Sequence, residues 1–398
     1  MTDLMIDRIR EHVAAETVPE LPLTDVLRRG RRVRRRRAAV RGGLTTAVVG
    51  ALLGGAVVIG GAHDKTSFSA DGVTSSISQD DVERVAAAYR TGGAFSRGHT
   101  LWFSDPDFSV DLGVTVQLMY YTADGVIAGV TNDVRGDARR DYVYVGTDGS
   151  VRRLDLPGKV VPGADAQADR FAYVTRASTG FEVHVVEAST GREIATTGFD
   201  APYTWAGWDV PPIGLTGDYV VVGVDGAQRV IDWRTGRTAA EVPGVQLPSV
   251  GGGRALGGEL EADVLRLGPS ERLRSVRDLA GPGDGVFAMN ALSPDGRFVL
   301  TSTTMRMLGR DGQVIGYSDG RTGEDVESPV VTVTSVDSGR RVTLPGDGFD
   351  YGWTPDGRLM RVDGRTVTTC DGATGACTER SVPDGPGTIK MAGKYLGS

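Results

Sequence analysis

The residues of this 398-residue chain best suited to covalent or metal chemistry are two cysteines and four histidines. Cys370 and Cys377 flank an Asp-Gly and a Thr-Gly turn signal, so the strands of one hairpin would bring them together. Because their domain is expected outside the cytoplasm, we predict a disulfide, with free or redox-active thiols as the alternative. A metal site would need further Cys or His nearby, and no histidine follows His184.

One segment resembles a catalytic motif by its letters. Residues 316–320 read Gly-Tyr-Ser-Asp-Gly, the pattern of the nucleophile elbow of hydrolases. An elbow must lead from a strand into a helix and be followed by an acid and then a histidine, and this chain offers neither helix signal nor histidine there. The sequence also lacks zinc-protease, phosphate-loop and dinucleotide motifs and a spaced calcium-loop series. It therefore predicts no catalytic, cofactor-binding or metal-binding residue.

A small aromatic cluster is the candidate binding surface. Tyr203, Trp205 and Trp208 precede Pro211-Pro212 in a stretch without regular periodicity. Large aromatics of this kind either pack inside the domain or form rigid anchors at a binding surface. Both interpretations stay open, and sugar stacking would be one use of an exposed cluster.

The charge distribution predicts how the chain is placed in the cell. Residues 1–41 contain 11 Arg and 6 acids and are +5, so the remainder of a −7 chain is −12. Residues 42–62 carry no charge and would rise about 31 Å as a helix, close to the thickness of a bilayer core. By the positive-inside rule we expect a single-pass protein of the cell membrane, with a cytoplasmic N-terminus and an exported C-terminal domain. The arginines that set this topology include Arg34, Arg35, Arg36, Arg37 and Arg41.

Two other interpretations of this segment remain. A cleaved signal peptide would use the small residues near 60–62, but the 41 residues before the apolar run are long for its basic region. The pair Arg36-Arg37 is a weak match to a twin-arginine signal because it lies inside a polybasic run. We therefore favour a retained anchor.

The cytoplasmic tail carries a short apolar stripe at helical spacing, formed by Met5, Ile6, Ile9 and Val13. The arginines are expected to contact anionic lipid headgroups. The stripe could alternatively fold against a cytoplasmic protein partner. Nucleic-acid binding is disfavoured because no aromatic residue is interleaved with the arginines to stack on bases.

The exported part is predicted to be all-β. With 40% hydrophobic and 24% charged residues it is not a disordered chain. After a spacer at 63–78, residues 79–92 predict one short helix capped by Ser78. Alternating strand-like runs then follow, for example 141–146, 181–187 and 219–224. The sequence contains 13 Asp-Gly pairs, which supply the positive φ of tight hairpin turns, so antiparallel hairpins dominate.

Repeated turn motifs indicate a β-propeller. Thr-Gly or Ser-Gly turns recur at residues 190, 235, 338 and 374, and Pro-Asp-Gly-Arg recurs at 294 and 355. A period of about 40–50 residues with four strands per unit predicts about seven blades, within six to eight, over residues 93–386. Residues 387–398 are predicted as a tail. We expect a strand at 99–104 to share the closing blade with the hairpins of 358–381, which the disulfide would reinforce.

Residues 291–300 and 352–359 resemble the start of a blade in WD40-like propellers of the TolB type. The resemblance covers about residues 99–385 and implies a scaffold used mainly for binding, without catalytic residues. The arrangement of Arg-rich tail, one span and exported propeller is similar to single-pass envelope proteins of actinobacteria. We therefore expect a non-enzymatic module that binds an envelope ligand and could pass its state to a partner of residues 1–41. The alternative is an exported propeller enzyme of the lyase, glycosidase or quinone-dependent dehydrogenase class.

Overall fold

The computed structural model describes residues 78–393 apart from 106, 132–139, 158–159, 205–208, 244–247, 258–262, 269–272, 279–288, 309–313, 321, 383–384, 386 and 388. These described residues belong to one compact unit, residues 66–398. The expected cytoplasmic tail, transmembrane segment and spacer up to residue 77 lie outside them. Within the described part of the chain, no helix has the length and apolar character needed to cross a membrane.

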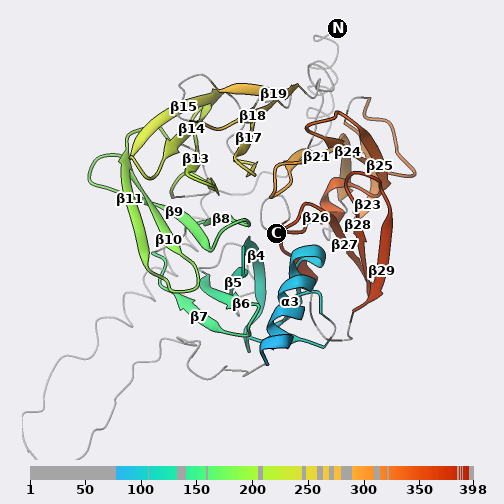
Figure 1. Cartoon of the computed structure of the whole chain (residues 1–398). Helices are drawn as coiled ribbons and strands as arrows, with labels where there is room; N and C mark the ends of the chain where they lie inside the picture. The colour runs from blue at the N-terminus through green and yellow to red at the C-terminus, as the bar shows by residue number, and fades with distance from the viewer. Residues whose placement is uncertain are drawn as a thin grey trace, which may run out of the picture. The chain divides into compact units, whose positions relative to one another are not determined.

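Seven antiparallel sheets of four strands each form a ring (Figure 1). We number the blades along the chain and name the strands of each from the centre outwards. Blade 1 has β30 (Ile389–Met391), β1 (Phe95–Arg97), β2 (Thr100–Trp102) and β3 (Ser109–Asp111); blade 2 has β4 (Val116–Thr122), β5 (Gly125–Val130), β6 (Asp141–Gly146) and β7 (Val151–Leu154); blade 3 has β8 (Gly163–Asp165), β9 (Arg170–Arg176), β10 (Phe181–Glu187) and β11 (Glu193–Phe199). Blade 4 has β12 (Ile213–Thr216), β13 (Tyr219–Val224), β14 (Ala227–Asp232) and β15 (Arg237–Pro243); blade 5 has β16 (Val250–Gly251), β17 (Arg254–Gly257), β18 (Asp263–Arg266) and β19 (Arg274–Asp278). Blade 6 has β20 (Met289–Leu292), β21 (Phe298–Ser302), β24 (Val330–Ser335) and β25 (Arg341–Pro345); blade 7 has β26 (Tyr351–Trp353), β27 (Leu359–Asp363), β28 (Thr366–Cys370) and β29 (Cys377–Ser381). The prediction of an all-β propeller with about seven four-stranded blades is confirmed.

Burial changes from the centre of a blade to its edge. Every residue of the second strand β5 is buried, because each face of that strand packs against a neighbouring blade. The outermost strands β25 and β29 are mostly exposed, which explains their Arg, Thr and Glu residues. The alternation that predicts strands in the sequence is therefore clearest in third strands such as β10 and β14, which lie between these extremes.

The two repeated sequence motifs occupy equivalent turns. Gly191, Gly236, Gly339 and Gly375 all have φ of 70–74° and join the third strand of a blade to the fourth. In each of these turns the glycine N–H donates to the carbonyl four residues earlier at 2.8 Å. The Pro-Asp-Gly-Arg motifs join the first strand to the second in blades 6 and 7. Each motif thus marks one position in the blade, and glycine is required there because the backbone is left-handed.

The ring closes through strands from the two ends of the described chain. β30 pairs antiparallel with β1, with Ser96 opposite Lys390 and Phe95 opposite Met391. Two sequence predictions are therefore wrong. The expected tail at 387–398 contributes the innermost strand of blade 1, and the hairpins of 358–381 with their disulfide belong to blade 7 instead. A three-residue strand flanked by glycines carries too little pattern to reveal a partner about 290 residues away.

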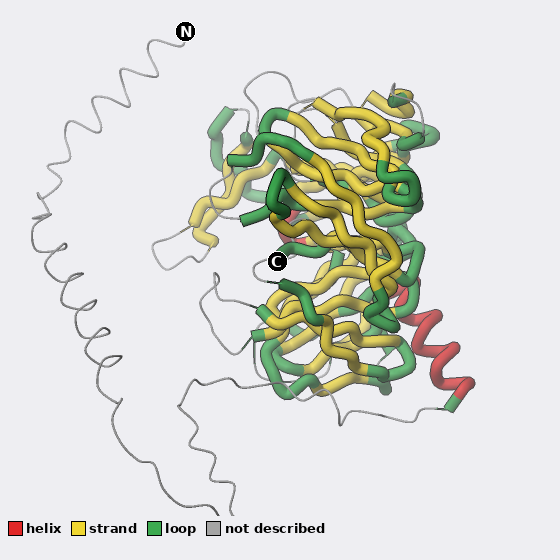
Figure 2. Tube along the Cα trace, turned by 90° about the vertical axis from the view of Figure 1, so that its left-hand side faces the viewer, coloured by secondary structure: helices red, strands yellow, loops and turns green. Residues whose placement is uncertain are grey.

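One helix, α3 (Gln79–Gly92), precedes the ring and packs on one of its end faces (Figure 2). Ser78 caps it by accepting from the N–H of Asp81. The helix buries Val85 and Tyr89, and the Tyr89 hydroxyl donates to the carbonyl of Thr122 at 2.6 Å. Since Thr122 ends β4, this contact fixes the helix at the end of the ring where innermost strands turn into second strands.

Candidate functional site

The innermost strands enclose a cavity of about 540 Å³ along the axis of the ring. Residues of β4, β8, β12, β16, β20, β26 and β30 contribute to its wall, so all seven blades take part. The wall combines apolar groups such as Leu118 and Val250 with the polar groups of Gln117 and Tyr120. A cavity of this size and mixed lining is typical of small-molecule binding sites. We call it the channel.

At the end of the channel next to α3, hydrogen bonds between turns join the blades. Contacts of this kind link successive blades around the ring: Ala123 N to Ala168 O, Gly217 N to Asp165 Oδ2, Gly253 N to Thr216 Oγ1, Gly252 N to Pro294 O, Arg297 Nη2 to Asp356 O, Trp353 N to Gly393 O and Ala94 N to the Tyr121 hydroxyl. One more bond joins blade 3 to blade 7, where Gln167 Nε2 donates to the Pro355 carbonyl at 2.8 Å. Because these blades are not neighbours, this bond crosses the ring at the end next to α3.

Charged groups in the channel wall are unequal in sign. Arg140 and Lys390 both line it, and Asp165 is the one carboxylate among the described residues that do so. Asp165 is buried and accepts from the N–H groups of Gln167 at 3.0 Å and Gly217 at 2.9 Å. Burial raises the pKa of Asp165, while these hydrogen bonds and the nearby Arg170 act in the opposite direction. The carboxylate is thus part of the turn structure.

A second feature projects from blade 6, where an insertion separates β21 from β24. It forms a separate two-stranded sheet of β22 (Thr304–Leu308) and β23 (Val314–Asp319). We call this element the projecting hairpin. It follows the end of β21, so it leaves the ring at the end opposite α3.

A single arginine fixes the projecting hairpin to the ring. Arg306 Nη2 donates to Asp347 Oδ1 and to Asp350 Oδ1, both at 2.7 Å, and its guanidinium lies 5.1 Å from the Phe349 ring centre. Asp347 is fully buried, and a capping box in the turn η1 (Gly348–Asp350) orients both carboxylates. Burial alone would lower the pKa of Arg306, but the hydrogen bonds and charges of the two aspartates outweigh it and raise that pKa. The arginine therefore stays charged and clamps the hairpin.

The hairpin carries most of the exposed apolar surface in the described part of the chain. Five large hydrophobic side chains are exposed there, and four of them lie on the hairpin: Met305, Leu308, Val314 and Ile315, with the fifth, Val330, at the start of β24. Ile315 is 71% and Leu308 59% exposed. Apolar groups gathered in this way mark interaction sites.

Acidic side chains follow the projecting hairpin in the chain. Glu324, Asp325 and Glu327 are exposed and form no ion pair with any described residue. Their segment runs along β23, because the N–H of Val326 donates to the Tyr317 carbonyl at 2.9 Å. The strands β22 and β23 thus present exposed apolar side chains beside an acidic segment.

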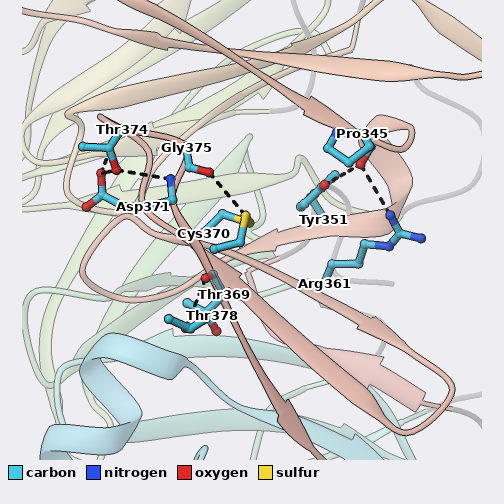
Figure 3. Close-up of a disulfide and its surroundings, with 11 residues drawn as sticks. Pro345, Tyr351, Arg361, Thr369, Cys370, Asp371, Thr374, Gly375 and Thr378 are labelled. Atoms are coloured by element: carbon cyan, nitrogen blue, oxygen red, sulfur yellow. Dashed lines mark hydrogen bonds between the residues drawn. A yellow bond between two sulfur atoms is a disulfide. The ribbon is translucent and has the colours of Figure 1, made fainter.

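The predicted disulfide is present between Cys370 and Cys377, which face each other across β28 and β29 (Figure 3). Cys370 is buried in the core with Trp353, whereas Cys377 is exposed at the blade edge. Asp371 accepts from the N–H and the hydroxyl of Thr374 in the intervening turn. The bond therefore holds the outer edge of blade 7.

The predicted aromatic cluster is only partly described, since Trp205 and Trp208 lie outside the described residues. Tyr203 is half-buried and meets Phe181 edge-on with ring centres 6.1 Å apart. Burial raises its pKa to about 12, and its hydroxyl has no hydrogen-bond partner among the described residues. Tyr203 thus packs on the core of blades 3 and 4, the packing alternative of the sequence analysis. The arginines Arg34, Arg35, Arg36, Arg37 and Arg41 lie outside the described residues too, so both predictions stay predictions.

The apparent elbow serine lies within a strand. Ser318 is in β23 and pairs with Met305, and a turn rather than a helix follows β23. His184 contacts Glu193 at 2.8 Å and stacks on Tyr173 at the outer part of blade 3. Among the residues that the structure describes, no three His, Cys, Asp or Glu side chains gather as a metal site would require.

Sequence reasoning missed Arg140, Lys390 and the clamp around Arg306. Arg140 and Lys390 are 250 positions apart and line the same cavity only because the ring closes. One signal existed, because a chain with 40 Arg uses Lys at only four positions and places one of them, Lys390, near its C-terminus. The hairpin itself looks like any other hairpin in the sequence, and its exposure depends on the third dimension.

No protein-family model and no curated protein matches the chain. Similar solved structures include Kluyvelomyces marxianus Hsv2, at 13% identity over 64% of this chain and 71% of that one, with a TM-score of 0.40. The WD40 domain of Toxoplasma gondii coronin follows, at 10% identity over 66% and 68%, with a TM-score of 0.38. Kuenenia stuttgartiensis hydrazine synthase is similar at 15% identity over 64% and 75%, with a TM-score of 0.35. The strand pairing alone shows that the chain has a seven-bladed β-propeller fold.

Proposed function

We propose that this protein is a single-pass membrane protein whose exported propeller is a non-enzymatic module for binding a protein partner. The projecting hairpin is the observation that carries the proposal. It displays Leu308 and Ile315 to solvent at a cost that a monomeric domain normally avoids. The Arg306 clamp holds this surface in one orientation, which lowers the entropic cost of docking.

The chemistry of the hairpin defines the partner. A partner segment with an apolar face would cover the exposed apolar side chains, and basic residues beside that face would meet Glu324, Asp325 and Glu327. Such rim charges contribute more to orientation and association rate than to affinity. The partner is therefore a protein with an apolar patch flanked by Lys or Arg.

The membrane part of the proposal is supported by the sequence. The uncharged run at 42–62 after an Arg-rich tail favours a retained span with the propeller outside. Residues 1–41 would contact anionic headgroups and could dock to a cytoplasmic protein.

Site-specific photocrosslinking in intact cells tests the proposal. A photoreactive residue at Ile315 should give an adduct with one discrete protein, and the same residue at Thr378, exposed on β29 of blade 7, should not. Leu308→Asp should remove the adduct while the melting temperature stays unchanged, since Leu308 is mostly solvent-exposed. Adducts that are equal at both positions, or absent at Ile315, would refute a docking role for the hairpin.

A further inference from the structure

The channel has a ligand preference that the hairpin does not explain. Lys390 lines the channel from β30, is half-buried, and has no hydrogen-bond or ion-pair partner among the described residues. A lysine in a recess normally acquires an anionic partner, because its charge loses hydration there. The only described carboxylate of the wall, Asp165, is engaged by Gln167 and Gly217.

Arg140 adds a second cation to the channel wall. It immediately precedes β6, whose start lies at the same end of blade 2 as the start of β4. Burial raises the pKa of Tyr120 and of Tyr142, and the charge of Arg140 nearby acts in the opposite direction. The Tyr120 phenol therefore stays protonated and can donate a hydrogen bond to a ligand in the channel.

These cations contrast with the rest of the exported part, which is −12 beyond residue 41. Two positive side chains in the walls of a narrow recess concentrate the potential there, because low-dielectric walls focus field lines. Anions would be repelled from most of the outer surface and attracted into the channel.

We propose that the channel binds a small organic anion, with Lys390 and Arg140 receiving its carboxylate or phosphate group. Tyr120 and Gln117 donate to the ligand, and apolar wall groups such as Leu118 contact its body. The cavity of about 540 Å³ lies in the range that holds small organic ligands. This site needs neither the projecting hairpin nor the membrane anchor, so it can fail or succeed separately from the proposed function.

Lysine labelling with a matched pair of probes tests the site in the full-length chain in lipid nanodiscs. Pyridoxal 5′-phosphate and pyridoxal both condense with a lysine ε-amine, losing water to form an imine, and added borohydride reduces the imine to a stable amine. The two probes differ only in the phosphate. Mass spectrometry then reports labelling at each of the four lysines, of which Lys394 serves as the reference.

We expect Lys390 to be labelled by the phosphate-bearing probe about tenfold more than by pyridoxal, the factor that one charge-assisted contact provides. Inorganic phosphate or citrate should suppress this labelling, and the stronger competitor shows whether phosphate or carboxylate is preferred. Arg140→Gln should reduce the preference, whereas Arg153→Gln on the outer strand β7 should leave it unchanged. Equal labelling of Lys390 by both probes, a preference no larger than at Lys394, or no labelling at Lys390 would overturn the proposal.

Discussion

Removal of β30 should unfold the whole ring rather than one blade. A chain ended at residue 385 loses the burial of Met391, which is 4% exposed and contributes about 2–3 kcal/mol. It also loses the bonds from Ala392 N to Ala94 O at 3.1 Å and from Trp353 N to Gly393 O at 3.0 Å, about 1 kcal/mol each. When the backbone hydrogen bonds between β30 and β1 are included, the free energy of unfolding should fall by about 4–6 kcal/mol. That is a large part of the stability of a typical domain.

The melting temperature measures this effect directly. For a domain of this size a loss of 4–6 kcal/mol corresponds to a decrease in melting temperature of about 6–10 °C. Thermal unfolding followed by circular dichroism compares the full-length chain, the chain ended at residue 385 and a control ended at Gly393. Only the chain ended at residue 385 should have a lowered melting temperature. The Met391→Ala variant should lose about 2–4 kcal/mol of unfolding free energy. Its melting temperature should therefore lie between those of the full-length chain and the chain ended at residue 385. If the shortened chain keeps a cooperative melt within a few degrees of full length and resists proteolysis, closure by β30 does not hold the ring together.

Three further predictions concern the disulfide, the Arg306 clamp and the charges that precede the uncharged run at 42–62. Cys370→Ser or Cys377→Ser should lower the free energy of unfolding by about 2–3 kcal/mol, measured by calorimetry, without preventing folding. The folded wild-type chain should not react with thiol reagents before reduction, and free thiols would contradict this. Arg306→Ala leaves the buried Asp347 without its cation and should lower the free energy of unfolding by about 2–3 kcal/mol. Proteolysis at the hairpin should become faster, and adding Asp347→Asn should restore part of the stability. An unchanged digestion pattern would refute the clamp. A reporter fused after Ser398 should be active only outside the cytoplasm, and cytoplasmic activity would reverse the predicted topology.

Local pattern predicts the blades because their chemistry is local. The predicted strand ranges 141–146, 181–187 and 219–224 agree with β6, β10 and β13 to the residue, because alternation and flanking turns mark them. The repeated Thr-Gly and Pro-Asp-Gly-Arg turns gave the blade number, since each occupies one fixed position in the unit. A propeller is therefore readable from one sequence when its turns require glycine at positive φ.

Closure and the site depend on contacts that no local pattern encodes. β30 has three residues between glycines, and its pairing with β1 joins positions about 290 apart. Lys390 and Arg140 reach one cavity only after the ring has closed. The side chains of the projecting hairpin alternate as in any blade hairpin, and only their placement outside a four-stranded sheet leaves Leu308 and Ile315 exposed.

The two end faces of the ring have different roles, and topology decides which is which. α3 binds at the end where β4 turns into β5, so the chain enters the propeller at this end of the channel. The projecting hairpin follows β21 and therefore leaves from the opposite end, where Arg140 also lies. The exposed apolar side chains of the hairpin and Arg140 therefore lie at the same end of the ring, so a protein docked on the hairpin could alter access of an anion to Lys390.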